Sequence, residues 1–185
     1  MMVLPNVTRF AVMNKFASSL AKTAPSHFLR IHESWLTPGT QSIHMIGIAI
    51  IMGSLLMIVF RIFGWAFTDQ SMLQTVDRFG PWVIGGLCLN LVTGLEMILA
   101  EPVRELVNLS FWTKMICVAI ATIVIVASFL GLRRHEEQWD MLVRRKSIKA
   151  AAVGTVVLFL CIIVLGRLIA YDHIWGTWSP ASRGY

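Results

Sequence analysis

The chain has 185 residues, of which 56% are hydrophobic and 14% are charged, and its formal net charge is +6. A soluble domain carries about 25% charged residues, so this composition excludes an ordinary soluble globular protein and predicts an integral membrane protein. The positive charge forms no basic stripe with interleaved aromatic residues, so we expect it to face anionic lipid rather than nucleic acid. The three cysteines lie in separate apolar segments without a Cys-x-x-Cys pair, which argues against a disulfide framework or a structural metal site.

Residues 1–40 form the first predicted segment. Its apolar residues recur at helical spacing: Met13, Phe16, Ala17, Leu20 and Ala24. Because lysines and small polar residues take the opposite side, this pattern predicts an amphipathic helix that lies in the membrane interface without crossing it. Pro38-Gly39 is then expected to turn the chain into the bilayer.

Four apolar segments follow, at about 41–64, 79–100, 110–132 and 150–171. Each is long enough to cross a bilayer as one helix, which takes about 20 residues. The predicted fold is therefore all-α, an integral membrane four-helix bundle over residues 41–171 with a short tail at 172–185. Pro81 is expected in the first turn of the second span, where its missing N–H costs little.

The loop from Arg133 to Lys149 holds six lysines or arginines and is the densest in positive charge. Short, positively charged loops favour the cytoplasmic face. With four spans, both chain termini then lie on the opposite face of the membrane.

One ionisable side chain lies in each span, about four residues from the boundary on the face of the termini. These residues are His44, Glu96, Lys114 and Arg167. At a rise of 1.5 Å per residue, all four lie about 6 Å below that boundary. Ionisable groups at this depth usually face the bundle interior or a wet cavity. The sequence therefore predicts one polar layer and a ligand pocket that opens towards the termini.

Two interpretations of this layer stay open. A neutral imidazole is a good axial ligand for haem iron, and helical bundles hold cofactors between facing helices. His44 is then the metal ligand, the two cations pair with haem propionates or quinone carbonyls, and His32 or His173 supplies a second axial ligand. Alternatively, the layer is a structural ion-pair network in which Glu96 lies between Lys114 and Arg167.

Copper handling is a further interpretation, because histidine and methionine suit soft copper ions. Met45, Met52 and Met57 line the first span beside His44. Apolar filling of the membrane is the simpler and preferred explanation of these methionines. A transporter is poorly supported, since the chain shows no inverted repeat and no spans broken by glycine or proline.

Four stretches carry a resemblance to known proteins. They read SWLTPGTQSIHMIGIAIIMGSLL, LCLNLVTGLEMILA, NLSFWTKM and GRLIAY. Their order resembles an uncharacterised bacterial family of four-helix integral membrane proteins, which is distantly similar to the copper-resistance D proteins and to HemJ-type protoporphyrinogen oxidase. The HemJ-like proteins place a histidine in a first-helix His-x-x-Gly context and a lysine at the start of a later helix. The resemblance implies that His44 ligates haem b and that Lys114 belongs to the same site. A bacterial family of this kind implies the inner membrane, and the charge of the loop from Arg133 to Lys149 then places the termini in the periplasm.

The functional prediction is a cytochrome-b-like membrane protein that exchanges electrons with quinone or a partner subunit. Its cofactor would lie near five residues: His44, Glu96, Lys114, Arg167 and His173. The alternative prediction is a non-enzymatic structural or assembly subunit of a membrane complex.

Overall fold

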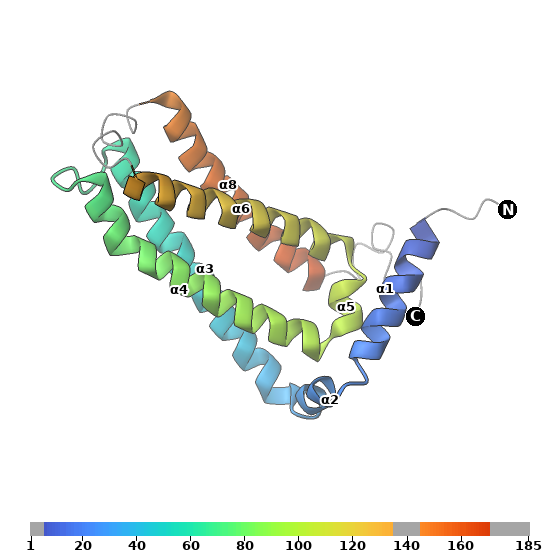
Figure 1. Ribbon diagram of the computed structural model, residues 1–185. Coiled ribbons are helices and arrows are strands. Elements are labelled where there is room, and N and C mark those ends of the chain that lie inside the picture. Colours follow the sequence, from blue (N-terminus) through green and yellow to red (C-terminus); the bar gives the residue numbers. More distant parts are fainter. Residues whose placement is uncertain (1–5, 135–144, 171–185) are drawn as a thin grey trace. The chain divides into compact units, whose positions relative to one another are not determined.

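The computed structural model describes residues 6–134 and 145–170 (Figure 1). Within these ranges it contains seven α-helices and no strand. The helices are α1 Asn6–Leu20, α2 Ala24–Ile31, α3 Glu33–Phe63, α4 Met72–Ala100, α5 Pro102–Leu106, α6 Leu109–Arg134 and α8 Lys146–Ala170. The prediction of an all-α fold is confirmed.

Four of these helices, α3, α4, α6 and α8, are long and apolar enough to cross a membrane. Their surfaces carry many exposed large apolar side chains, such as Ile116 and Ile123 on α6 and Val164 on α8. Soluble monomers rarely expose so much apolar surface, whereas a surface of this kind is suited to contact with lipid tails. By helix length and composition, the chain is a membrane protein.

The prediction that Pro38-Gly39 turns the chain is wrong, because α3 begins at Glu33 and contains Pro38. A proline ring clashes with the carbonyl four residues earlier, and here that residue is Ser34. Ser34 lies in the first turn of α3, so the backbone hydrogen bond that Pro38 removes is near the start of the helix and not in its middle. The Pro38 carbonyl accepts a hydrogen bond from the Ser42 hydroxyl at 2.8 Å.

The expected start of the second span at Phe79 also differs from the structure, in which α4 begins at Met72 and contains Pro81. A capping box explains the earlier start. The Ser71 N–H donates to Gln74 Oε1 at 3.0 Å, and the Gln74 N–H donates to Ser71 Oγ at 3.2 Å. This reciprocal pair satisfies two N–H groups that a helix start leaves without partners, so the helix begins there.

The connection between α3 and α4 is closed by hydrogen bonds. The Gly64 N–H donates to the Arg61 carbonyl and the Trp65 N–H donates to the Phe60 carbonyl, which is the Schellman arrangement of a helix end. This arrangement requires a left-handed residue, and Gly64 has φ 75°. Arg61 Nε then reaches across the connection to the Gln70 carbonyl at 2.8 Å.

The contacts divide the chain into two compact units. The first unit consists of Met1–His44, Leu91–Met115 and Ile163–Tyr185, and the second consists of Met45–Asn90 and Ile116–Ile162. The first unit has a small apolar cluster around Ala17, Leu106, Val107, Phe111 and Ile169. Ala17 belongs to α1, which packs on α5. Ala17 is fully buried, although Phe16 beside it is exposed.

The second unit has the larger apolar cluster, and its helices α3 and α4 approach closely at glycines. A Cβ added to Gly86 would lie 2.6 Å from Cγ1 of Ile51 and 3.2 Å from the Gly47 carbonyl oxygen. A Cβ added to Gly47 would collide with the Asn90 side chain. Small residues therefore set the helix separation here, as is common where lipid surrounds a bundle.

Candidate functional site

His44 lies in the first unit, where α3 faces α4. Its Nδ1 is 2.7 Å from the hydroxyl oxygen of Thr93, which is 5% exposed. A Cβ added to Gly94 would lie 3.7 Å from Cε1 of the imidazole, so the ring passes over this glycine at van der Waals distance. The hydrogen bond fixes the orientation of the ring. In the tautomer with its proton on Nδ1, the ring donates to Thr93 and Nε2 keeps a lone pair for a ligand.

A second hydrogen bond joins the same two helices one turn away. The Thr40 hydroxyl donates to Glu96 Oε1 at 2.6 Å, and Thr40 is buried. Thr40 precedes His44 by one turn on α3, and Glu96 follows Thr93 by about one turn on α4. The two pairs therefore form a short polar ladder between the helices. The ion-pair interpretation expects Glu96 to lie between Lys114 and Arg167. In the structure, the hydrogen-bond partner of Glu96 is Thr40.

Lys114, on α6, is half-buried and lies against α8. A Cβ added to Gly166 would be 3.6 Å from the lysine Nζ, so the ammonium group lies directly over this glycine at van der Waals distance. The Lys114 charge acts electrostatically on His44 and on Glu105 of α5. The same positive charge therefore acts on the histidine and on a buried carboxylate that the sequence analysis did not select.

Glu105 is 6% exposed and is the buried acid of this region. The pKa of its carboxyl is raised above the ordinary value of 4.5, chiefly because burial removes water from the charged form. The positive charges of Arg104 and then Lys114 oppose this shift. Arg104 also forms ion pairs with Glu105, at 3.8 Å, and with Glu101. Burial therefore raises the pKa of Glu105, and the two nearby cations reduce that rise.

The other two predicted residues have different outcomes. Arg167 lies on α8 in the first unit, beside Gly166, and its side chain is exposed. His173 lies outside the described residues. Of the predicted set, the structure brings His44 and Lys114 within electrostatic range and places Glu96 one turn from the His44 pair.

Within residues 6–134 and 145–170, no three His, Cys, Asp or Glu side chains are grouped so that they would hold a metal ion. A metal site built from such side chains alone is therefore not formed by this part of the chain. A haem differs, because its porphyrin supplies four nitrogen ligands and the protein adds only axial ones. One well-oriented imidazole suits that requirement.

Comparison with known proteins adds a family. A family model described as Family of unknown function (DUF6644) matches residues 32–172. The chain belongs to this family. The match confirms the expectation of a family without an assigned function. No curated protein and no solved structure matches the chain.

The region that defines DUF6644 includes the whole polar cluster and the four apolar helices, and it begins after α2. Sequence reasoning missed three members of this cluster: Thr40, Thr93 as a histidine partner, and Glu105. A signal for Glu105 was present, since Pro102, Glu105 and Leu106 recur at helical spacing and all three are buried in α5.

Proposed function

We propose that the protein binds haem b with His44 as an axial ligand and passes electrons to or from quinone or a partner protein. The observation that carries this proposal is the hydrogen bond between His44 Nδ1 and Thr93. Histidines that bind a metal almost always engage the other ring nitrogen in this way, which fixes the tautomer and the ring direction. In the tautomer in which Nδ1 donates to Thr93, Nε2 would be the ligand atom.

The surroundings of His44 fit a haem in their chemistry. Gly94 and Gly166 leave space beside the imidazole and the Lys114 ammonium group. Lys114 and Arg167 would pair with the two propionate carboxylates of a haem, which are anions that need cationic partners in a membrane. A bound haem would supply one-electron chemistry at its iron. The chain's own contribution would be to orient the imidazole through Thr93 and to neutralise the propionates.

The resemblance of the sequence motifs to the copper-resistance D and HemJ-type proteins supports the same assignment. It implies a haem site that contains both His44 and Lys114. It also implies a bacterial inner membrane. The positive charge of the loop that includes Arg133, Arg134 and Arg145 favours the cytoplasmic face for that loop and the periplasm for the termini.

The proposal is tested by the visible absorption spectrum of the detergent-purified protein, oxidised and then reduced with dithionite. We expect a haem b spectrum in the wild type and its loss in His44→Ala. The matched control is His27→Ala, which removes an exposed imidazole from α2. Equal haem content in the two variants would remove His44 from the site, and a wild type that stays colourless when supplied with haem would end the proposal.

A structural role is the second candidate, and the ladder between α3 and α4 favours it. Both hydrogen bonds of the ladder join polar side chains that would otherwise meet lipid or apolar neighbours. A subunit that only holds its helices together would remain colourless. It would lose thermal stability in Thr40→Val and in Thr93→Val to similar extents, because each variant breaks one rung of the ladder.

A further inference from the structure

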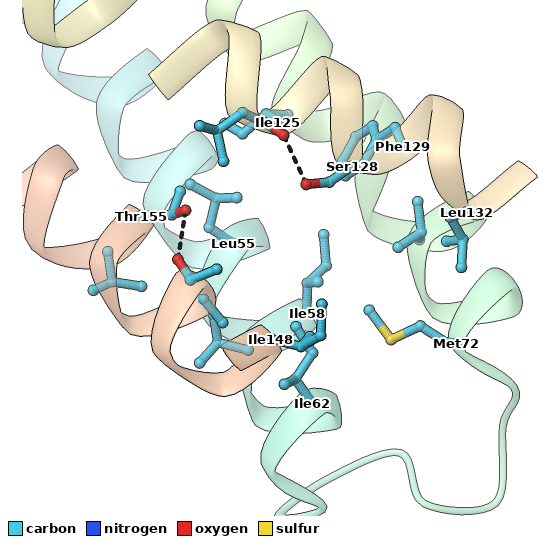
Figure 2. A pocket seen from close by; sticks show the side chains of 16 residues that line it. Leu55, Ile58, Ile62, Met72, Ile125, Ser128, Phe129, Leu132, Ile148 and Thr155 are labelled. Carbon is cyan, nitrogen blue, oxygen red and sulfur yellow. Dashed lines mark hydrogen bonds between the residues drawn. The ribbon is translucent and has the colours of Figure 1, made fainter. Parts of the chain in front are cut away.

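The second unit contains an apolar cavity of about 110 Å³ that is partly open. Figure 2 shows that its lining side chains come from α3, α4, α6 and α8 and point towards a common space. Apolar residues make up most of the lining, for example Leu55, Ile62, Met72, Ile125, Leu132 and Ile148. Apolar cavities of this order stay dry and accept small apolar groups.

The two hydroxyl groups in the lining do not change this character. Ser128 Oγ donates to the Val124 carbonyl at 2.7 Å, and Thr155 Oγ1 donates to the Ala151 carbonyl at 2.9 Å. Both bonds stay within one helix, as the dashed lines in Figure 2 show. The hydroxyl hydrogens are therefore already used, and hydrocarbon is the chemistry that suits the space.

Positive charge surrounds the end of this cavity. Two lining residues, Leu132 and Ile148, lie within two residues of cations on their own helices. We call these cations, together with Arg145 directly before α8, the basic rim: Arg133, Arg134, Arg145, Lys146 and Lys149. Since a helix rises 1.5 Å per residue, the rim begins within one turn of the cavity lining.

Two rim cations contact residues outside the rim. Arg133 pairs with Asp77 at 3.3 Å, and both side chains are more than half exposed. The Lys149 ammonium group lies 5.5 Å from the centre of the Phe63 ring. Exposed pairs of this kind contribute little and leave the cations able to meet another anion. Among the described residues at this end of the second unit, the five rim cations, Arg61 and Arg78 outnumber the acids Asp69 and Asp77, so the end is electropositive.

We propose that the cavity and the basic rim bind an anionic phospholipid, with a segment of one acyl chain in the cavity and the phosphate on the rim. An amphiphile with a hydrocarbon chain and a negative head matches both halves of the site. Basic pockets between membrane helices bind anionic lipid heads for the same reason. A neutral lipid or a quinone tail would fill the cavity without using the rim. The site lies wholly in the second unit and does not depend on haem.

The test uses the full-length protein in detergent and native mass spectrometry with two lipids of equal chains, dioleoyl phosphatidylglycerol and dioleoyl phosphatidylcholine. We expect the dissociation constant for phosphatidylglycerol to be at least about tenfold lower, because each nearby cation contributes roughly a factor of five. Equal dissociation constants would overturn recognition of the phosphate. Preferential binding of a long-chain quinone over phosphatidylglycerol would overturn the choice of occupant.

Two leucines placed in the cavity test the position of the acyl chain. Ala151 and Ser128 line the cavity, whereas their sequence neighbours Ala150 and Ala127 do not. We expect Ala151→Leu with Ser128→Leu to weaken phosphatidylglycerol binding about tenfold. Ala150→Leu with Ala127→Leu should leave binding unchanged. Equal binding by the two double variants would overturn the cavity as the acyl-chain site.

A charge variant tests the rim without touching the cavity. We expect Arg145→Gln with Lys146→Gln and Lys149→Gln to lose most of the preference for phosphatidylglycerol. The control Lys15→Gln with Lys22→Gln and Arg30→Gln removes the same charge from exposed positions of the first unit. An equal loss in the control would show that net charge alone attracts the lipid, which would overturn a defined site. This arm stands even where the filled cavity impairs folding.

Discussion

Different contacts join α3 to α4 inside each of the two units. In the first unit, α3 and α4 are joined by the hydrogen bonds of Thr40 with Glu96 and of His44 with Thr93. In the second unit, the same two helices meet at Gly86 and Ile51 without polar contact between these two residues. Lipid tails provide no hydrophobic drive for helix association, so membrane helices rely on close packing and on interhelical hydrogen bonds. The pair of α3 and α4 shows interhelical hydrogen bonds in the first unit and close packing at Gly86 in the second unit.

The difference between the units shows that the interhelical hydrogen bonds of His44 and Glu96 are in the first unit. In the second unit, α3 and α4 approach closely at Gly47 and Gly86. The polar side chains of the first unit add interhelical hydrogen bonds between the same two helices. Their concentration around His44 and Lys114 is consistent with a ligand site and would otherwise have to serve specificity of assembly.

The largest effect is expected where the second unit is most closely packed. Gly86→Leu should lower stability by about 3 kcal/mol, because its side chain would occupy the space of Ile51 and the Gly47 backbone. Thermal unfolding followed by circular dichroism should show a fall of roughly 6–12 °C. The control is Gly85→Leu, where a Cβ meets nothing within 4 Å. A similar fall in both variants would contradict the close-packing account.

The next effect concerns the first unit. Thr93→Val keeps the side-chain shape and removes the hydroxyl that meets His44, and we expect a loss of about 1 kcal/mol. Thr113→Val serves as the control, because that hydroxyl bonds only to the Leu109 carbonyl of its own helix on an exposed face. Apparent melting temperatures of the two variants decide the matter. No difference between them would mean that the histidine contact does not hold the helices.

A pH-dependent effect should follow from Glu105. Its carboxyl has a raised pKa in the folded state, so its stabilising contribution is complete below the ordinary value of 4.5 and is lost as pH rises through the raised pKa. Glutamine does not titrate. The melting temperature of Glu105→Gln relative to wild type should therefore increase between pH 4.5 and pH 7.5. Glu33→Gln controls for the loss of one exposed acid, and a flat difference for Glu105→Gln would contradict the argument.

The smallest effect is expected at the exposed pair of Arg133 and Asp77. Solvent screens this contact, since both side chains are more than half exposed. Asp77→Asn should change stability by less than about 0.5 kcal/mol. A melting temperature shifted by more than a few degrees would reveal a larger role for charge in the second unit, and the contrast between the units would weaken.

Hydropathy was sufficient to predict the four long helices, but it did not locate all of their ends. Pro38 and Pro81 indicated boundaries that the structure does not have, because both lie inside helices. The true start of α4 depends on the side-chain hydrogen bonds between Ser71 and Gln74. That Ser-x-x-Gln pattern was legible in the sequence and carries more information about a helix start than a proline does.

Counting residues from the membrane boundary grouped His44, Glu96, Lys114 and Arg167, and all four lie in the first unit. Such counting gives the depth of a residue and not the direction of its side chain around the helix axis. It therefore missed that Thr40 bonds to Glu96. It also missed Glu105, because α5 is a helix of five residues in a segment that was expected to be a plain connection.

The closed connection between α3 and α4 bears on how this protein enters a membrane. The Schellman end at Gly64, the bond from Arg61 to Gln70 and the capping box at Ser71 all form within a few residues of one another in sequence. Such local bonds form without waiting for the rest of the chain, so the two spans can leave the translocon together as a helical hairpin. For labelling studies of sidedness, a single cysteine at the exposed Thr68 preserves this hairpin, whereas an inserted epitope would break it.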